Sequence, residues 1–380
     1  MPTRRSVIEL LAGGGAASVV GGCATKPSVD PIAAWRNPGA GERDPRRWAL
    51  AHAILAPNPH NRQPWLIDLK GSDEIVFYAD TTRLLPATDP PNRQITVGCG
   101  AFLELFDLAA REAGRRAEIT LWPEGEPQPN LDARPIAHIR LSADPTVTRD
   151  PLFAQILRRH TTRTPYDLQA PPTPTELATV VAAATGAGIA AGTVTDPKDR
   201  AALIDLGWRG WDLEAHTPRT HMESVRLLRI GAKEIAEHRD GVSLEGPMFE
   251  ALKAMGMISP AMLADPDSFG AKSSDKAAKA ALEATPAFFW LKGQDNSRAT
   301  QIGAGRAYAR AQLAATAMGH CFQPWSMTLQ EFPEMATLYD ATQTRLGATP
   351  QVPLQMLVRL GRAKFVAPAP RRGLAEHIRA

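Results

Sequence analysis

The segment RRHTTRTPYD (158–167) carries the side chains needed to bind an anion. Three arginines and two threonines stand within its first six residues. Guanidinium groups bind phosphate oxygens in a bidentate fashion, and such charge-assisted hydrogen bonds are about twice as strong as neutral ones. The alternative is a solvated basic helix end, because the segment follows an expected helix whose C-terminal dipole disfavours an anion. A second basic pair, Arg371 and Arg372, is a candidate to close over the same anion.

The segment ILAPNPHNRQPW (54–65) places two turn prolines, two asparagines, a histidine and a Gln-Pro-Trp between an expected helix and an expected strand. One interpretation is an ordinary turn. The other is a cradle for a flat aromatic ligand with a polar edge, because asparagine amides offer both a donor and an acceptor. The residues alone leave both interpretations open.

Composition and motifs exclude several other classes of protein. The formal net charge is +3 with a pI near 8.8, and no basic stripe typical of a nucleic-acid binder is visible. The chain has no His-Glu-x-x-His motif and no Gly-x-Ser-x-Gly elbow around Ser243. The glycine pairs at Gly98 and Gly303 do not complete a dinucleotide fingerprint. Cys99 and Cys321 are interpreted as small apolar residues, with a disulfide between them left open.

The first 23 residues predict an export signal. Arg4 and Arg5 precede a modestly apolar run that is too short for a membrane span and ends in small residues. The sequence Thr-Arg-Arg-Ser-Val-Ile resembles a bacterial twin-arginine signal, and Val-Gly-Gly-Cys (20–23) resembles a lipoprotein box ending at Cys23. We therefore expect a periplasmic protein, anchored to the membrane if Cys23 is lipidated, with residues 24–46 as a linker. The alternative is a ragged cytosolic terminus.

The expected secondary-structure elements outline an α+β fold. Strand patterns lie at residues 74–80, 117–122, 136–141, 287–293 and 354–361. Helices are expected over residues 152–159, 175–184 and about 200–238.

An internal repeat is also visible. The segments GCGAFLELFDLAAREAG (98–114) and GAGRAYARAQLAATAMG (303–319) share Gly-x-Gly, Leu-Ala-Ala and a final Gly at the same spacing. We expect the first glycines to mark a helix start and the last glycine a helix end. The repeat predicts two related halves that form an internal pseudo-dimer, unless it is a coincidence of an alanine- and glycine-rich chain.

Together these motifs resemble the nitroreductase superfamily of flavoproteins. PNPHNRQPW is similar to that family's Pro-Ser-x-x-Asn-x-Gln-Pro-Trp segment, and RHTTR is similar to its Arg-x-Ser-x-Arg phosphate motif. In ordinary members the phosphate motif comes first, and FMN lies between two subunits. Here the loop comes first, as the fusion of two subunits would produce. RLLPATDPPNRQITVGCGA (83–101) and PRRGL (370–374) also resemble the fused, Acg-type branch.

The resemblance implies one FMN per chain, because the second half lacks its own copy of the opening loop. It assigns the phosphate to the motif around His160 and to a second basic contact, namely Arg159, Thr161, Arg163, Arg371 and Arg372. It assigns the isoalloxazine edge and flavin N5 to Pro57, Asn58, Pro59, His60, Asn61, Pro324, Ser326 and Met327. Ser326 and Met327 replace the family's usual Glu-Gly, which puts the hydride-accepting face in question.

The implied protein is an FMN-dependent oxidoreductase with a nitroreductase-like fold of mixed or antiparallel sheets flanked by helices. Its halves would span residues 47–147 and 148–380, with residues 211–276 as a lid or a plain helical insert. It would be a monomer that exchanges electrons with a small-molecule or protein partner, without metal or nucleic acid. Two alternatives remain: a protein that stores or sequesters FMN without turnover, and a structural lipoprotein with a degenerate site.

Overall fold

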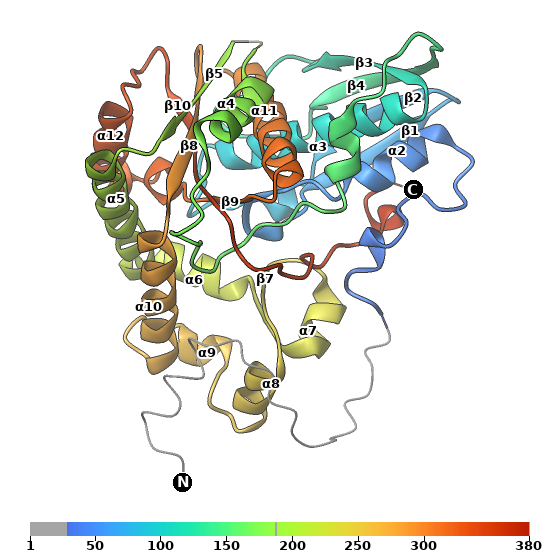
Figure 1. Ribbon diagram of the computed structural model, residues 1–380. Helices are drawn as coiled ribbons and strands as arrows, with labels where there is room; N and C mark the ends of the chain where they lie inside the picture. Colours follow the sequence, from blue (N-terminus) through green and yellow to red (C-terminus); the bar gives the residue numbers. More distant parts are fainter. Residues whose placement is uncertain (1–28, 187, 380) are drawn as a thin grey trace.

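A four-stranded sheet forms the core of the first part of the chain. The computed structural model describes residues 29–186 and 188–379 (Figure 1). The sheet follows helix α2 (Pro45–Ala53), and the 20-residue helix α3 (Arg93–Glu112) connects its second and third strands. Its strands are β1 (Trp65–Lys70), β2 (Glu74–Ala79), β3 (Arg115–Leu121) and β4 (Ala137–Ala143). The spatial order is β1-β2-β4-β3, and every neighbouring pair is antiparallel.

A second four-stranded sheet repeats this arrangement. It follows helix α4 (Pro174–Ala184), and the 20-residue helix α11 (Arg298–Ala317) again connects the second and third strands. Its strands are β5 (Ile189–Val194), β8 (Ala287–Gly293), β9 (Cys321–Pro324) and β10 (Leu354–Gly361), and helix α12 (Ala336–Arg345) precedes β10. The order β5-β8-β10-β9 matches that of the first sheet, and all pairs are antiparallel. The five predicted strands and the α+β class are confirmed.

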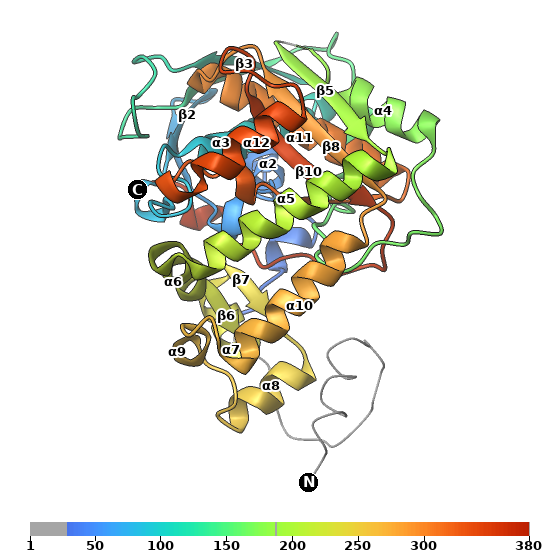
Figure 2. The same ribbon diagram turned by 90° about the vertical axis from the view of Figure 1, so that its left-hand side faces the viewer.

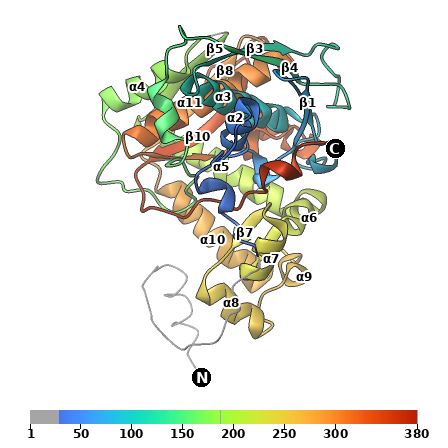
Figure 3. The same ribbon diagram turned by 90° about the vertical axis from the view of Figure 1, so that its right-hand side faces the viewer.

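Helices α3 and α11 cross between the two sheets (Figures 1 and 3). Gly100 and Gly305 stand at the crossing. A Cβ on Gly305 would lie 1.9 Å from the carbonyl oxygen of Val97, and one on Gly100 would lie 2.1 Å from that of Ile302. Only glycine lets two helix backbones approach this closely. The crossing therefore explains why the repeat carries glycine at these positions.

The boundaries of these helices differ in part from the prediction. The expectation that the first glycines of the repeat begin the helices is wrong, because α3 starts at Arg93 and α11 at Arg298. These glycines lie inside the helices, and the close crossing requires the second of each pair, Gly100 and Gly305. The final glycines, Gly114 and Gly319, do follow the helix ends, with φ of +66° and +77°.

Residues 218–283 form a lobe beyond helix α5 (Pro197–His216), below the two sheets in Figure 1. The predicted helix over 200–238 is interrupted, because Thr217 is extended before Pro218 and proline disfavours a helical residue in front of it. The lobe contains α6 (Pro218–Arg226), β6 (Leu228–Ile230), α7 (Gly231–His238), β7 (Val242–Leu244), α8 (Pro247–Ala254), α9 (Pro260–Leu263) and α10 (Phe269–Glu283). Helix α10 returns alongside α5, as Figure 2 shows.

The predicted helix over 152–159 is also wrong. Only a 3-10 turn, η4 (Pro151–Gln155), forms there. The chain then becomes extended, and Thr161 makes a parallel bridge with Phe322 of β9. This correction removes the objection that a helix C-terminus would face a bound anion, because no α-helix ends at the arginines.

The segment after β10 runs back across the molecule to the first sheet. Ile378 forms a parallel bridge with Ile67 of β1, whose N–H donates to the carbonyl oxygen of His377 at 2.9 Å. We call residues 362–379 the C-terminal arm. The arm carries Arg371 and Arg372 to the loop that follows α2.

Candidate functional site: a buried arginine pair beside the Pro57–Gln63 loop

The loop between α2 and β1 has an unusual backbone. His60, Asn61 and Gln63 have φ of 47°, 53° and 50°, a region that residues other than glycine seldom adopt. The side chain of Asn58 closes the loop, because its Oδ1 accepts from the N–H of Gln63 at 2.7 Å and its Nδ2 donates to the carbonyl oxygen of Ala56 at 3.0 Å. Strained backbone of this kind persists where the surrounding structure enforces it, which is common at functional sites.

Asn61 connects this loop to the C-terminal arm. Its Nδ2 donates to the carbonyl oxygen of Pro370 at 3.0 Å, and its Oδ1 accepts from Nη1 of Arg371. Pro57 and Pro59 lie on either side of Asn58, and Pro59 begins the short 3-10 turn η2 (Pro59–Asn61). The amides of both asparagines are thus bonded within the protein, and their role is to shape the loop.

Arg159 and Arg371 come from distant parts of the chain and meet beneath this loop. Both donate to the carbonyl oxygen of Leu55, Arg159 through Nη2 at 2.8 Å and Arg371 through Nη2 at 3.5 Å. Both guanidinium groups also lie over the ring of Trp35, at 5.4 and 5.5 Å from its centroid. Their remaining partners are the side chain of Gln312 for Arg159 and backbone carbonyl oxygens for Arg371.

Neither arginine has a carboxylate partner among residues 29–186 and 188–379. Arg159 is 3% exposed and Arg371 is 4% exposed, and the Nε of each has no hydrogen-bond partner in the described structure. Burial lowers the pKa of both groups, and the charge of Arg159 lowers that of Arg371 further. Buried charges are normally paired, since taking an ion out of water costs several kcal/mol. Two buried guanidinium groups with unused donors therefore fit a dianion such as a phosphate ester.

The remaining residues of the 158–163 motif have different environments. Burial lowers the pKa of His60 to about 4, and the positive charges of Arg163 and Arg62 contribute further to this shift. The anion motif and the loop after α2 are therefore close enough to interact electrostatically. His60 stays neutral at physiological pH, and its Nδ1 is buried without a partner in the described structure. Thr161 is half-buried, with its backbone held by Phe322.

His160 points toward β9. Its Nδ1 lies 3.0 Å from the carbonyl oxygen of Arg158, and its Nε2 lies 3.7 Å from Sγ of Cys321. Cys321 and Cys99 are both buried and free, so the disulfide left open by the sequence does not form. In the described part of the chain no cluster of side chains suits a metal ion. Likewise, no helix there is long and apolar enough to cross a membrane.

The segment predicted to lie near flavin N5 packs against β10 and α5. Pro324 ends β9 opposite Val358, and the Oγ of Ser326 donates to the carbonyl oxygen of Leu357 at 3.2 Å. Met327 begins the 3-10 turn η5 (Met327–Leu329), which contacts α5 at Gly210. The hydroxyl of Ser326 is therefore directed to the backbone of the second sheet.

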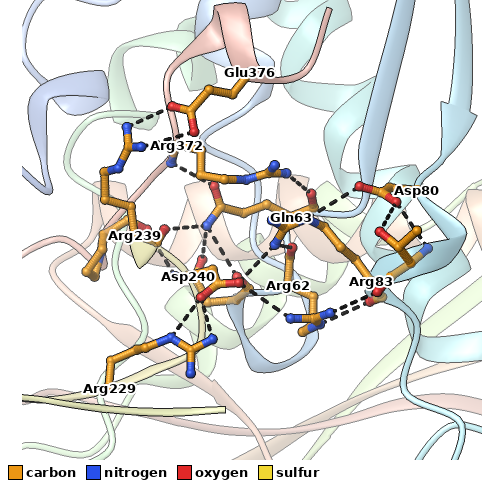
Figure 4. Close-up of polar contacts among 12 residues, drawn as sticks. Arg62, Gln63, Asp80, Arg83, Arg229, Arg239, Asp240, Arg372 and Glu376 are labelled. Carbon is orange, nitrogen blue, oxygen red and sulfur yellow. Dashed lines mark hydrogen bonds and ion pairs between the residues drawn. The ribbon is translucent and has the colours of Figure 1, made fainter. Parts of the chain in front are cut away.

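Arg372 belongs to a different group of side chains, shown in Figure 4. Its Nη2 donates to the carbonyl oxygen of Gln63 at 2.8 Å, and its N–H donates to Oε1 of the same residue at 2.9 Å. Nε2 of Gln63 donates to the carbonyl oxygen of Arg239, whose guanidinium pairs with Glu376 at 2.7 and 3.0 Å. These contacts fasten the loop, the C-terminal arm and the lobe to one another.

Asp240 is at the centre of this group (Figure 4). Its carboxylate accepts from Arg229 at 2.8 Å, from Arg83 at 2.9 Å and from Arg62 at 3.4 Å. Burial raises the pKa of Asp240, but the charges and hydrogen bonds of Arg229 and Arg83 outweigh it, so that the net shift is downward. We call Asp240, Arg62, Arg83 and Arg229 the carboxylate clasp.

The sequence did not point to several residues of the arginine pair's surroundings. Trp35 lies in the segment expected to be a linker, yet it is 7% exposed and contacts both guanidinium groups. Gln312 of α11 and the carbonyl oxygen of Leu55 also contact Arg159. An isolated tryptophan in a Pro- and Arg-rich stretch was the one available signal, since such a stretch has little other reason to carry one.

Comparison with known proteins supports a partial relationship. No family model matches the chain. It is 35% identical over 120 residues to a Mycobacterium tuberculosis protein named "Putative NAD(P)H nitroreductase acg", and 32% identical over 126 residues to an uncharacterised protein of the same organism. Each match covers 31% of this chain, and 34% and 35% of those proteins. The chain thus matches about a third of the curated relatives' own length, which is distant homology over part of the chain.

Solved structures of low sequence identity also resemble the chain. The FMN and NADPH-dependent nitroreductase NfnB from Sphigopyxis sp. strain HMH is 17% identical, with a TM-score of 0.39 over 61% of this chain and 99% of that one. The FMN-dependent nitroreductase NfnB from Mycobacterium smegmatis in complex with NADPH is 18% identical, with a TM-score of 0.37 over 60% and 96%. Both TM-scores are below 0.5, and the fold described above rests on its own topology.

Proposed function

We propose that the chain is a nitroreductase-like flavoprotein that binds one FMN and passes electrons through it. The observation that carries this proposal is the buried pair Arg159 and Arg371, which has unused donors and no carboxylate partner among the described residues. The phosphate of FMN would supply the missing negative charge and accept from both Nε groups. The partial similarity to a protein named as a nitroreductase supports the same assignment.

The proposed site combines two related halves of the chain, residues 47–147 and 148–380. Support comes from the identical strand orders of the two sheets and from the glycine crossing of α3 and α11. The first half would contribute the loop at Pro57–Asn61, and the second half would contribute Arg159, Thr161, Arg163 and Arg371. Since one strained loop and one arginine pair account for the site, we propose a single FMN per chain in a monomer.

When bound, FMN supplies hydride and single-electron chemistry. The chain's own contribution is to position the ring and to set the charge around it. Arg163 and the neutral His60 lie close enough to interact electrostatically, and positive charge near the ring would favour its reduced, anionic form. The electron acceptor would be a small molecule or a protein.

The test of FMN binding compares FMN with riboflavin, which lacks the phosphate. Replacing Arg159 and Arg371 with methionine removes two charge-assisted contacts, each about 1.5–3 kcal/mol. We expect fluorescence titration to show a loss of FMN affinity of roughly 10²–10⁴-fold, with riboflavin affinity little changed. Arg158→Met is the matched control, because among the described residues that exposed guanidinium donates only to the side chain of Gln155. Equal FMN affinity in the double variant, or a stoichiometry of two, would contradict the proposal.

A protein that stores FMN without turnover is the second candidate. One observation favours it: α5 lies directly against residues 325–328, where Nε1 of Trp325 donates to the carbonyl oxygen of Gly207 at 3.0 Å. A helix against this segment would leave less room for a nicotinamide ring at flavin N5. Stopped-flow mixing distinguishes the candidates. Reduction by NADPH at about 1–1000 per second supports the oxidoreductase. Full reduction by dithionite with none by NADPH supports storage or another donor.

We also propose export by the twin-arginine route to the periplasm, with Cys23 as a lipid anchor. The residues that motivate this, Arg4, Arg5 and Cys23, lie outside the described part of the chain. Export of the folded protein would allow FMN to be inserted in the cytoplasm. Changing both arginines to lysine should leave the protein in the cytoplasmic fraction, and unchanged export would refute the route.

A further inference from the structure

Tyr308 has an unexplained buried hydroxyl. It lies on α11 and is 2% exposed, and its ring contacts Phe322 with centroids 6.0 Å apart. The ring is therefore part of the second hydrophobic core, but its hydroxyl has no hydrogen-bond partner in the described structure. Buried tyrosine hydroxyls usually make a hydrogen bond, because leaving a buried hydroxyl without one costs about 1–3 kcal/mol.

The hydroxyl of Tyr308 lies on the side of α11 that faces Arg159. Gln312 follows Tyr308 by four residues, so both side chains stand on one face of the helix. Gln312 reaches the anion motif, since its Oε1 accepts from Arg159 at 3.5 Å and its Nε2 donates to the carbonyl oxygen of His160 at 3.4 Å. The charge of Arg159 also opposes the rise that burial causes in the pKa of Tyr308. The side chain of Gln312 therefore links the face of α11 that carries Tyr308 to the anion motif.

We propose that Tyr308 is a further phosphate-binding residue, whose hydroxyl donates a hydrogen bond to the anion held by Arg159 and Arg371. The inference rests on the proposed function, because it assumes that FMN occupies this site. It adds a neutral donor from the helix that crosses the centre of the molecule. Sequence motifs do not assign this residue, since Tyr308 lies inside the repeat and 145 positions after Arg163.

Tyr166 provides an internal comparison. It is also buried, at 3% exposure, and it lies three residues after Arg163. Its hydroxyl, however, donates to the carbonyl oxygen of Thr162 at 3.2 Å, so its hydrogen-bonding capacity is used within the protein. The two tyrosines should therefore respond to loss of the hydroxyl in opposite ways.

The experiment replaces each tyrosine with phenylalanine and measures FMN affinity, riboflavin affinity and unfolding of the flavin-free protein. Tyr308→Phe should weaken FMN binding by roughly 10-fold, as expected for one hydrogen bond to a charged group, and leave riboflavin unchanged. It should leave the flavin-free protein as stable or more stable, because an unpartnered hydroxyl is removed. Tyr166→Phe should lower the stability of the flavin-free protein and leave FMN affinity within about twofold.

A second measurement follows the phosphate directly. The ³¹P resonance of bound FMN should shift in Tyr308→Phe and stay in place in Tyr166→Phe, whatever the catalytic activity of either variant. If Tyr308→Phe binds FMN as tightly as the unmodified chain, with an unchanged resonance, the inference is wrong. Loss of FMN binding in Arg159→Met would then still support the proposed function. If the unmodified chain does not discriminate between FMN and riboflavin, both the inference and the proposed function fail.

Discussion

Two groups of arginines, one buried and one partly buried, flank the same short turn, Asn61 to Gln63, and they differ in their negative partners. On the Gln63 side the carboxylate clasp surrounds Asp240 with three guanidinium groups at 2.8–3.4 Å. On the Asn61 side Arg159 and Arg371 meet only carbonyl oxygens, amide oxygens and a tryptophan ring in the described structure. Arg159 and Arg371 are only 3% and 4% exposed. The arginine side chains of the clasp are 12–22% exposed, so the group that lacks a carboxylate is also the less solvated one.

The comparison suggests different roles for the two groups: the clasp holds segments of the fold together, and the pair is the proposed anion site. A carboxylate that accepts from several arginines compensates their charges and holds three segments together, namely the loop, η3 (Thr81–Arg83) and the lobe. The two arginines of the pair repel each other, so bringing their charges together costs free energy. Our proposal is that an external anion offsets this cost. On that proposal, the same residue type serves stability in the clasp and ligand binding in the pair.

The largest loss of folding stability is expected when the negative charge of Asp240 is removed from the clasp. Asp240→Asn leaves Arg62 and Arg229 without a carboxylate partner among the described residues, whereas Arg83 keeps Asp80 at 3.4 Å. Breaking a buried ionic group in this way costs about 3–5 kcal/mol. Urea unfolding should show this loss, together with earlier proteolysis of the lobe at residues 218–283. Asp132→Asn is the control, because the pair of Asp132 with Arg134 is exposed and screened by solvent, so that its loss should change stability little. Equal effects of the two variants would refute the role of the clasp.

A smaller loss of folding stability is expected at low pH, through His377 on the C-terminal arm that joins the two groups. His377 is fully buried, and burial followed by the charge of Arg372 lowers its pKa to about 3. Unfolded chains bind a proton at this side chain below about pH 6.5, whereas the folded chain does not. Folding stability should therefore fall as the pH is lowered from 7 to 4.5, by on the order of 2 kcal/mol for this residue. His377→Gln should be less sensitive to pH in this range, and parallel curves for both proteins would contradict the assignment.

The smallest effect on stability is expected at the arginine pair. Arg159→Met replaces a buried charge that lacks a carboxylate partner with an unbranched apolar side chain that matches the arginine stem. The free energy of unfolding of the flavin-free protein should change by less than about 1 kcal/mol, although FMN affinity falls. Calorimetry with and without FMN separates the two quantities. A loss as large as that of Asp240→Asn would mean that the pair serves the fold, and the contrast between the two groups would not hold.

Local sequence patterns predicted most of the secondary structure. The five strands appear at the expected places because alternating or continuous apolar residues specify which face is buried, as in β2. The limits of the helices were less predictable. The pattern around Arg158 favours a helix, but an extended partner at Phe322 is available only in the folded chain, and the segment joins it. The glycines of the repeat were recognised, but their reason, a crossing with another helix, depends on a contact 205 residues away.

The sequence by itself determined which chemistry the chain has available: two asparagines and a histidine in a turn, and two arginine-rich segments far apart along the chain. Only the tertiary structure decided how those arginines are used. Arg371 and Arg372 are adjacent and identical in type, yet one joins Arg159 and the other binds Gln63. Successive side chains of an extended segment point to opposite sides. Whether Arg371 or Arg372 faces Arg159 depends on how the C-terminal arm docks against β1. No local sequence pattern encodes that contact.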